Sequence, residues 1–248
     1  MQNFAARGKL YIGTSGWSYK HWKDIFYPAN LPERKWLEFY ATKFSTVEIN
    51  NSFYRLPRRE TFESWRASTP PGFVFAVKAN RYITHIKKLK NVDTALVRFF
   101  ENASGLADKL GPVLFQFPAN WHANADRLES FLNILPNGYK YAFEFRHTSW
   151  FRDNIYALLE QKGAALCIAD SPEWPSPFKI TAPFVFIRMH GSRQLYASDY
   201  TTDELSRWAK KIGDLLDRRL DVYIYFNNDA HGYAVKNAQE LRELLQCI

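Results

Sequence analysis

The chain has 248 residues, of which 46% are hydrophobic and 17% aromatic, so it can bury a large core and is too apolar to be disordered. Its 33 Lys and Arg residues outnumber its 25 Asp and Glu residues, and the formal charge of +8 favours an anionic partner, although a solvated basic surface would explain it equally well. Two cysteines, Cys167 and Cys247, are too few for a disulfide framework. The first residues lack the apolar core of a signal peptide, and no apolar run reaches about 18 residues. We therefore expect a cytoplasmic protein without membrane contact.

Short apolar segments recur along the chain at intervals that leave room for a helix between them. In chain order, strands are predicted over residues 10–14, 46–50, 73–79, 113–117, 141–145, 164–170, 184–191 and 221–228. Gly111 and Pro112 are expected to break the chain before the fourth of these strands.

Large apolar residues at helical spacing fill most of the intervals. One stripe runs over residues 36–44, and another over residues 96–110, where Asp93 is expected to cap the helix. Thr148 or Ser149 is expected to cap the helix that follows the fifth strand.

The last third of the chain contains one connection of a different kind. Residues 171–183 hold four prolines, so an irregular connection is predicted there in place of a helix. Beyond it, Thr201 and Glu204 have the spacing of a capping box at the start of a long amphipathic helix.

Strands that alternate with helices over the whole chain favour a parallel sheet. An open doubly wound sheet would carry a glycine-rich phosphate turn after its first strand, and GTSGWS matches neither the dinucleotide nor the P-loop pattern. The sequence therefore predicts an α/β fold, a TIM-type (β/α)8 barrel that occupies residues 1–248 as one domain.

Polar residues stand at the ends of the predicted strands, where a TIM barrel places its active site. The candidate catalytic residues supply carboxylates, an amine and an imidazole, and they are Glu48, Lys78, Glu144 and His190. The candidate binding residues are Asn50, Arg146, His147, Asp170, Arg188, Asn227 and Asn228. The arginines suit bidentate binding of a carboxylate or phosphate. One of the glutamates is expected to be a general base with a raised pKa, and His190 is expected to titrate near neutral pH.

These residues favour an enzyme that acts on a small anionic substrate by acid–base or hydrolytic chemistry. Two alternatives stay open. The acids and the cations could neutralise one another, in which case the mouth is a salt-bridge plug without catalytic function. Alternatively, Glu48, Glu144, Asp170 and His190 could bind a divalent metal ion, although the neighbouring cations would compete for the carboxylates. No nicotinamide, flavin or pyridoxal motif stands out, so no cofactor is predicted.

A third alternative comes from the loops, which are rich in aromatic and basic residues. The aromatic group is Trp17, Tyr19, Trp22, Phe53, Tyr54, Trp150, Trp174, Tyr196 and Tyr200, and basic residues such as Arg81, Lys87 and Lys88 stand near it in the sequence. Such rings can stack on bases, so a nucleic-acid-binding protein or a metal-dependent nuclease is the alternative function. His21, His85 and His122 also lie in these loops, where a surface position is expected.

Several motifs in this order resemble one known family. They are GTSGWSYKHW, EINNSFYRLP, FAVKANRYITH, FQFP, FEFRHTSW, RMHG and YFNNDAHGYAVKNA, and they extend over residues 12–245. Together they resemble the YecE-like family, catalogued as the domain of unknown function DUF72. The resemblance implies a TIM-type barrel and implies no activity, so the expected chemistry rests on the residues named above.

Overall fold

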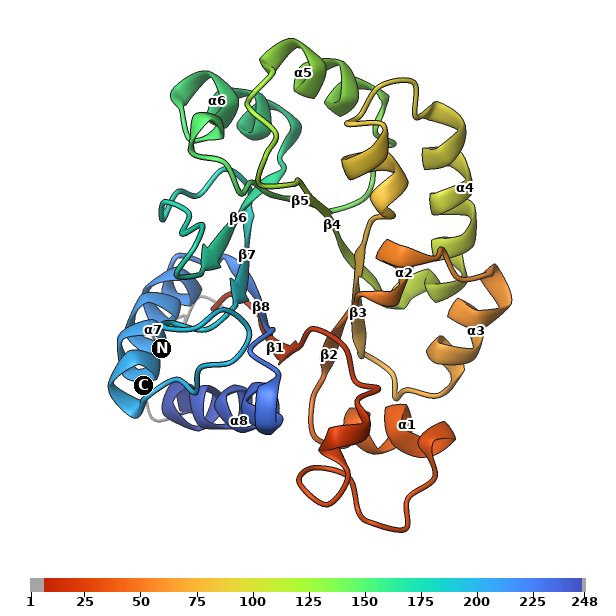
Figure 1. The fold of residues 1–248 in the computed structure, drawn as a ribbon, viewed down its shortest axis with the longest axis vertical. Coiled ribbons are helices and arrows are strands. Elements are labelled where there is room, and N and C mark those ends of the chain that lie inside the picture. Colours follow the sequence, from red (N-terminus) through yellow and green to blue (C-terminus); the bar gives the residue numbers. More distant parts are fainter. Residues whose placement is uncertain (1–6, 247–248) are drawn as a thin grey trace, which may run out of the picture.

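The computed structural model describes residues 7–246, which form a single eight-stranded barrel surrounded by helices (Figure 1). The strands are β1 (Leu10–Thr14), β2 (Thr46–Ile49), β3 (Val74–Lys78), β4 (Leu110–Gln116), β5 (Tyr141–Glu144), β6 (Ala165–Asp170), β7 (Phe184–Met189) and β8 (Asp221–Phe226). Their order in the sheet is β1-β8-β7-β6-β5-β4-β3-β2, and all the pairs are parallel. The predicted TIM-type barrel is confirmed.

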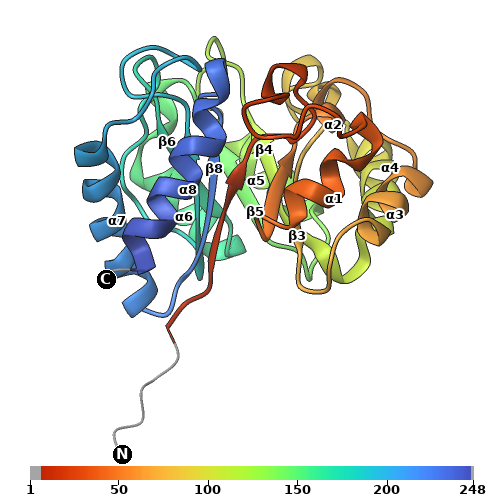
Figure 2. The same cartoon turned by 90° about the horizontal axis from the view of Figure 1, so that it is seen from below.

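Helices cover the outside of the barrel, as Figures 1 and 2 show from two directions. The α-helices are α1 (Trp36–Ala41), α2 (Asn51–Tyr54), α3 (Arg59–Ala67), α4 (Asp93–Ala103), α5 (Ala125–Ile134), α6 (Asp153–Lys162), α7 (Thr202–Asp217) and α8 (Tyr233–Gln246). Short turns are η1 (Lys20–Trp22), η2 (Glu33–Lys35), η3 (Tyr82–Ile86), η4 (Ser104–Lys109), η5 (Thr148–Trp150) and η6 (Ala230–Gly232); η3 is a π-helical turn and the others are 3₁₀. Residues 171–183 connect β6 to β7 without a helix, as predicted.

Three local predictions need correction, and one is confirmed. Gly111 and Pro112 lie inside β4 rather than before it. Pro112 has no N–H to donate to a neighbouring strand, and the β3–β4 ladder is irregular at this point, with a register shift between Phe75 and Val77. The strand therefore tolerates the proline. Gly111 allows close packing there, since a Cβ would lie 2.5 Å from the Val74 side chain. The capping box formed by Thr201 and Glu204 is present at the start of α7.

The other two corrections concern helix caps. Asp93 is the first residue of α4, and the N-cap position belongs to Val92, which makes no side-chain cap. Neither Thr148 nor Ser149 caps α6, because the chain first forms the turn η5 and buries Trp150 against the carbonyl of Trp121.

Strand alternation divides the interior into two cores. Inside the barrel lie residues such as Ala76, Leu114, Ala142, Phe186 and Tyr225, which point inward from the strands. The larger core lies between the strands and the helices and contains many aromatic side chains. This arrangement leaves the last inward-pointing residue of each strand at the C-terminal mouth.

The barrel closes between β1 and β2 through a side chain. One parallel bridge joins Ser15 to Glu48, and Tyr40 of α1 inserts its hydroxyl between the two strands. That hydroxyl accepts a hydrogen bond from Thr14 N and donates to Thr46 O, both at 3.0 Å. Gly13 lies so close to β2 that a Cβ would come within 2.2 Å of Thr46 O. Tyr40 therefore replaces backbone hydrogen bonds at the closing seam.

Two predictions concern residues that the structure does not describe. Residues 1–6 and Cys247 lie outside the described part, so the expectations about the N-terminus and the cysteine pair stay predictions. Within residues 7–246, no helix combines the length and the apolar character that crossing a membrane requires.

Candidate functional site

A layer of polar side chains covers the apolar interior of the barrel at the C-terminal ends of the strands. In four strands the polar residue comes two positions after an inward-pointing apolar one, so both share a face. The polar members are Lys78 after Ala76, Gln116 after Leu114, Glu144 after Ala142 and Arg188 after Phe186. The strand register thus brings residues far apart in the sequence to one mouth.

Arg188 lies at the centre of this layer and binds two carboxylates. Its Nη1 donates to Glu144 Oε2 and its Nη2 donates to Glu48 Oε1, both at 2.7 Å. All three side chains are buried, with exposed fractions of 1% for Arg188 and 0% for each glutamate. Ser15 donates a further hydrogen bond of 2.9 Å to Glu48 Oε1. Such close ion pairing offsets the desolvation that burial of these charges requires.

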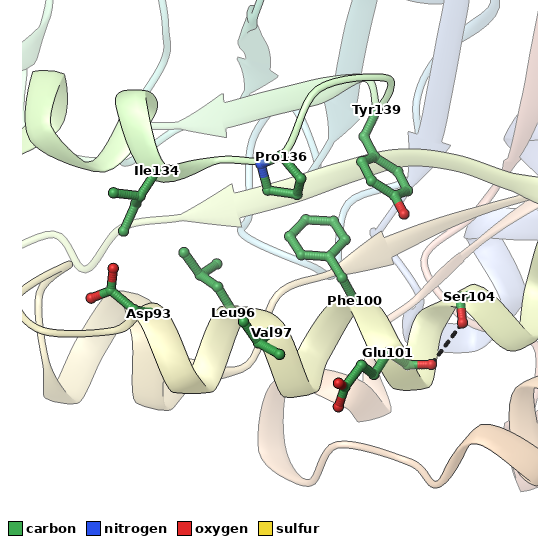
Figure 3. A pocket seen from close by; sticks show the side chains of 9 residues that line it. All are labelled: Asp93, Leu96, Val97, Phe100, Glu101, Ser104, Ile134, Pro136 and Tyr139. Atoms are coloured by element: carbon green, nitrogen blue, oxygen red, sulfur yellow. Dashed lines mark hydrogen bonds between the residues drawn. The ribbon is translucent and has the colours of Figure 1, made fainter.

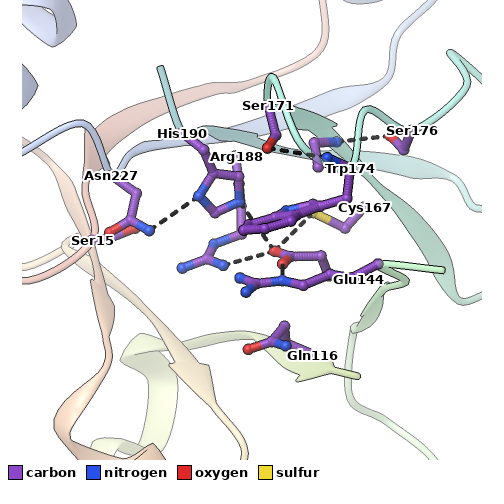
Figure 4. Close-up of polar contacts among 12 residues, drawn as sticks. Ser15, Gln116, Glu144, Cys167, Ser171, Trp174, Ser176, Arg188, His190 and Asn227 are labelled. Atoms are coloured by element: carbon purple, nitrogen blue, oxygen red, sulfur yellow. Dashed lines mark hydrogen bonds and ion pairs between the residues drawn. The ribbon is translucent and has the colours of Figure 1, made fainter. Parts of the chain in front are cut away.

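Arg146 adds a second guanidinium group to the same network. Its Nε donates to Glu144 Oε1 at 2.7 Å, and its guanidinium carbon lies 4.2 Å from the ring centre of Trp174. Trp174 reaches this position from the irregular β6–β7 connection (Figure 4). Within residues 7–246 the terminal nitrogens of Arg146 make no hydrogen bond, so they can bind a ligand.

His190 lies beside the carboxylates as a neutral imidazole. Its Nδ1 accepts a hydrogen bond of 3.1 Å from the amide nitrogen of Asn227, and its Nε2 lies 3.4 Å from Glu144 Oε2 (Figure 4). Burial lowers the pKa of His190 to about 4, although Glu144 acts in the opposite direction. The expectation that His190 titrates near neutral pH is therefore wrong.

Glu144 also differs from its prediction. Burial favours the protonated acid, but the two arginines and His190 outweigh it and hold the pKa of Glu144 well below its ordinary value. The expected raised pKa is therefore wrong for Glu144, which is a fully ionised and fully paired carboxylate. The Cys167 thiol lies 4.0 Å from Glu144 Oε2, and burial together with this charge raises its pKa well above the ordinary value.

Lys78 differs from both arginines because it has no acidic partner. No carboxylate among residues 7–246 lies within 4.0 Å of its Nζ, which instead sits 4.1 Å from the ring centre of Phe53. Burial, followed by the charge of Arg188, lowers the pKa of Lys78 to about 7, against the opposing effect of the two glutamates. Both the ammonium and the free amine are therefore populated near neutral pH.

His85 is a further member of the mouth. The ring of His85, in the turn η3, lies 4.9 Å from the ring of Phe53. Burial, together with Lys78 and Arg146, lowers the pKa of His85 to about 4. The expectation of a surface position is wrong, since the side chain is half-buried next to Lys78.

Several sequence-predicted residues do not join the network. His147 points away, because its Nδ1 bonds to Ser149 and its ring lies 3.9 Å from that of His122. Asp170 accepts a hydrogen bond of 2.9 Å from Trp208 of α7, on the outside of the barrel. Asn228 bonds to Ser198 O and Asn237.

The position of Asp170 also bears on the metal alternative. The four residues considered for a metal ion, Glu48, Glu144, Asp170 and His190, are not brought together. No cluster of three or more His, Cys, Asp or Glu side chains in the described part of the chain is spaced to hold a metal ion. Asn50 lies at the edge of the mouth as the N-cap residue of α2, and its Oδ1 makes no hydrogen bond.

Several buried polar atoms of residues near the mouth have no hydrogen-bond partner among residues 7–246. They include Glu48 Oε2, Asn50 Oδ1, Trp174 Nε1, Arg188 Nε and His190 Nε2. Leaving such atoms unpaired costs about 1–3 kcal/mol each. A ligand or ordered water at the mouth would satisfy them.

Sequence reasoning missed the roles of Ser15, Phe53 and Trp174 at this site. Ser15 directly follows β1, so the rule that selected the other strand ends would have selected it. The contacts of Phe53 with Lys78 and of Trp174 with Arg146 connect distant loops, and no local pattern signals them.

A separate apolar groove lies on the outside of the barrel. It has a volume of about 440 Å³ and is formed by α4 and the segment around Ile134, Pro136 and Tyr139 (Figure 3). None of the predicted site residues lines it. The groove and the polar mouth are therefore separate sites that share no residues.

Comparison with known proteins identifies the family of the chain. A family model described as "Protein of unknown function DUF72" matches residues 11–247. The UPF0759 protein YunF of Bacillus subtilis (strain 168) is 28% identical over 270 aligned residues, covering 95% of this chain and 94% of that protein. The UPF0759 protein YecE of Escherichia coli (strain K12) is 31% identical over 168 residues, covering 65% of this chain and 59% of that protein.

Solved structures show the same fold. A DUF72 family protein from Thermotoga maritima MSB8 superposes with a TM-score of 0.86 and 29% identity, covering 96% of this chain and 99% of that chain. A DUF72 family protein from Enterococcus faecalis V583 superposes with a TM-score of 0.83 and 21% identity, covering 96% and 95%. The chain belongs to the DUF72 (UPF0759, YecE-like) family of proteins of unknown function.

Proposed function

We propose that the protein is an enzyme that binds a small anionic substrate, carrying a phosphate or a carboxylate, at the C-terminal mouth of the barrel. The observation that carries the proposal is the unpaired state of Lys78. The two carboxylates of Glu48 and Glu144 balance the two guanidinium groups of Arg146 and Arg188. Lys78 has no salt-bridge partner within residues 7–246, so an anionic group would pair with its protonated form and complete the site.

The surroundings of Lys78 add to this positive surplus. The guanidinium carbon of Arg81 lies 6.0 Å from the ring centre of Phe53, the same ring that Lys78 covers. The unoccupied terminal nitrogens of Arg146 suit bidentate binding of a phosphate or a carboxylate. In this proposal Arg188 holds the two glutamates in position, because both its terminal nitrogens already bind them.

A salt-bridge plug is the competing explanation, and the position of Lys78 argues against it. A plug that serves stability would pair each of its buried cations with an acid, since a buried charge without a partner destabilises the folded state. Here Lys78 has no acid partner within residues 7–246. This feature fits a site that is completed by its substrate.

Within the proposed enzyme, Lys78 serves as the proton donor or as the charge that binds the anion. Its pKa of about 7 lets it exchange a proton at neutral pH, which is the property that general acid–base catalysis requires. His190 is neutral, and its Nε2 carries the ring proton because its Nδ1 accepts from the Asn227 amide, so Nε2 can donate a hydrogen bond to an anionic substrate.

The proposal is tested by a thermal-shift screen of the purified chain. Inorganic phosphate, sugar phosphates, nucleotides and mono- and dicarboxylates are each added to the wild type, to Lys78→Gln and to the matched surface variant Lys210→Gln. A ligand at 100 times its dissociation constant should stabilise the folded state by about 2.7 kcal/mol. We expect at least one anion to raise the melting temperature of the wild type and of Lys210→Gln, and to leave Lys78→Gln unchanged.

Two results would contradict the proposal. One is the absence of stabilisation of the wild type by every anion in the screen. The other is equal stabilisation of the wild type and Lys78→Gln, which would place the binding site elsewhere on the basic surface.

A further inference from the structure

The chain buries two lysines, and they differ in their hydrogen bonds. Lys109, with 7% of its surface exposed, donates from Nζ to Arg66 O, Thr69 O and Thr69 Oγ1 at 2.6–3.0 Å. An ammonium group has three donors, so Lys109 is satisfied as a structural cation. Lys78, with 8% exposed, has no such acceptor among residues 7–246.

The surroundings of Lys78 favour its free amine. Its Nζ lies against the ring of Phe53, and Arg188 and Arg146 are close enough to oppose a further positive charge. Desolvation and neighbouring cations are the means by which enzymes convert a lysine into a nucleophile. With a pKa of about 7, roughly half of the Lys78 side chains are uncharged at pH 7.

Groups that can carry protons stand next to this amine. His85 shares the Phe53 contact with Lys78 and is neutral, with a pKa of about 4. The chain after η3 holds Lys88, Leu89 and Asn91 at positive φ (46°, 66° and 52°), a conformation that non-glycine residues rarely adopt. The connection that carries His85 is therefore strained, as connections at functional sites often are.

We infer that Lys78 is a covalent catalyst, forming an imine with the carbonyl carbon of a substrate whose anionic group binds at the same mouth. This inference rests on the proposed function and names the substrate class more narrowly: an aldehyde or ketone that carries a carboxylate or a phosphate. Glu48 and Glu144, held in place by their ion pairs to Arg188, are near enough to act on the charge of Lys78 and would partly offset that of an iminium nitrogen.

The covalent step is balanced within the site. The lone pair of Lys78 Nζ attacks the carbonyl carbon and forms the C–N bond, while the carbonyl oxygen takes up a proton. The nitrogen then loses a proton, the hydroxyl group is protonated, and the C–O bond breaks to release water. The sum is one amine and one carbonyl compound converted to one imine and one water, with no oxidant or reductant.

The test is reductive trapping of the imine. The full chain is incubated at pH 7 with glyoxylate, pyruvate or dihydroxyacetone phosphate, with and without sodium cyanoborohydride, and the modified lysines are located by peptide mass spectrometry. We expect at least one probe to modify Lys78 about tenfold faster than the exposed Lys210, because the lowered pKa of Lys78 populates its free amine at pH 7. Added inorganic phosphate should slow this reaction by competing for the anion site.

Lys78→Arg provides the matched control, since it keeps the charge and cannot form an imine. It should lose the fast modification and keep the stabilisation by anions. Modification of Lys78 that is no faster than that of Lys210 for all three probes would overturn the inference. If the wild type still responds to anions in the thermal-shift screen, that result leaves the proposed function standing; if it does not, both fall.

Discussion

Among single residues, Lys78 and Lys109 show most clearly how a functional group differs from a structural one. Both are almost fully buried, but only Lys109 has a full set of acceptors. A buried lysine without a partner destabilises the folded state, because the unfolded chain holds the ammonium in water at no such penalty. Functional sites keep such groups at the expense of stability.

The first prediction compares these two lysines. Replacing Lys78 by Met should raise the free energy of unfolding at pH 7 by about 2 kcal/mol, since an apolar side chain of similar shape removes a poorly solvated amine. For a chain of this size the melting temperature should rise by about 4–8 °C. Thermal or urea unfolding of the purified variant measures the change.

Lys109→Met is the matched control. It removes three hydrogen bonds, including one to the buried Thr69 carbonyl, so it should lower the free energy of unfolding by about 2 kcal/mol or more. Destabilisation of similar size in both variants would show that Lys78, too, is a structural cation.

The second prediction concerns the pH dependence of His190. Its pKa is about 4 in the folded protein and near 6.5 when unfolded, so between these values the unfolded chain binds more protons. The free energy of unfolding should therefore fall as the pH drops from about 6.5 to about 4, by up to about 1.4 kcal/mol per pH unit for this group. Urea unfolding at pH 6.5, 5.7 and 5.0 measures the slope.

Variants separate His190 from other titrating groups. His190→Gln should flatten the slope between pH 6.5 and 5.0, and His85→Gln should flatten it by less, because that side chain is only half-buried. An unchanged slope in His190→Gln would mean that His190 has the same pKa in the folded and the unfolded chain, which would contradict the lowered pKa.

Among the elements, β1 and β2 form the weakest junction of the barrel, and Tyr40 of α1 closes it. Its hydroxyl satisfies Thr14 N and Thr46 O, two backbone groups that would otherwise be paired in a regular ladder. The seam also positions the mouth, because Ser15 directly follows β1, Glu48 lies in β2, and the two side chains bond to each other.

The third prediction follows from this seam. Tyr40→Phe leaves both backbone groups buried and unpaired, so it should lower the free energy of unfolding by about 1–3 kcal/mol. Hydrogen exchange of the Thr14 amide should become faster at the same time. Tyr54→Phe is the control, since Tyr54 is 72% exposed, and it should change neither quantity. Equal protection of Thr14 in wild type and Tyr40→Phe would rule out a role for the hydroxyl at the seam.

The strands could be predicted from the sequence, but the junction that closes the barrel could not. Every predicted strand is present because parallel barrel strands are buried on both faces and form continuous apolar segments. The Gly111–Pro112 pair misleads because a register shift in the β3–β4 ladder tolerates the missing N–H. The β1–β2 seam could not be foreseen, since it depends on a tyrosine contributed by a neighbouring helix.

At the scale of the whole molecule, the barrel converts strand ends into a site. The sequence correctly predicts that Glu48, Glu144, Arg188 and His190 meet, because the C-terminal ends of parallel strands share one mouth. The pKa of His190 and that of Glu144 escape prediction, because burial and ion pairing act against each other and only the distances decide the outcome.

The distribution of positive charge at the mouth is also a property of the whole molecule. Of the cations at the mouth, Arg146 and Arg188 are neutralised by acids, whereas Lys78 is not. The net charge of +8 alone could not have distinguished a basic surface from an anion-binding mouth. The unpaired lysine supplies that distinction, and both the proposed function and the covalent role depend on it.

The most direct test is therefore a nuclear magnetic resonance titration of Lys78, with its side-chain signals assigned by their absence in Lys78→Arg. We predict a midpoint at about pH 7, which moves to higher pH when an anion such as inorganic phosphate occupies the mouth. A midpoint near the ordinary value of 10.5, unaffected by anions, would contradict the account and identify the mouth as a stable salt-bridge plug.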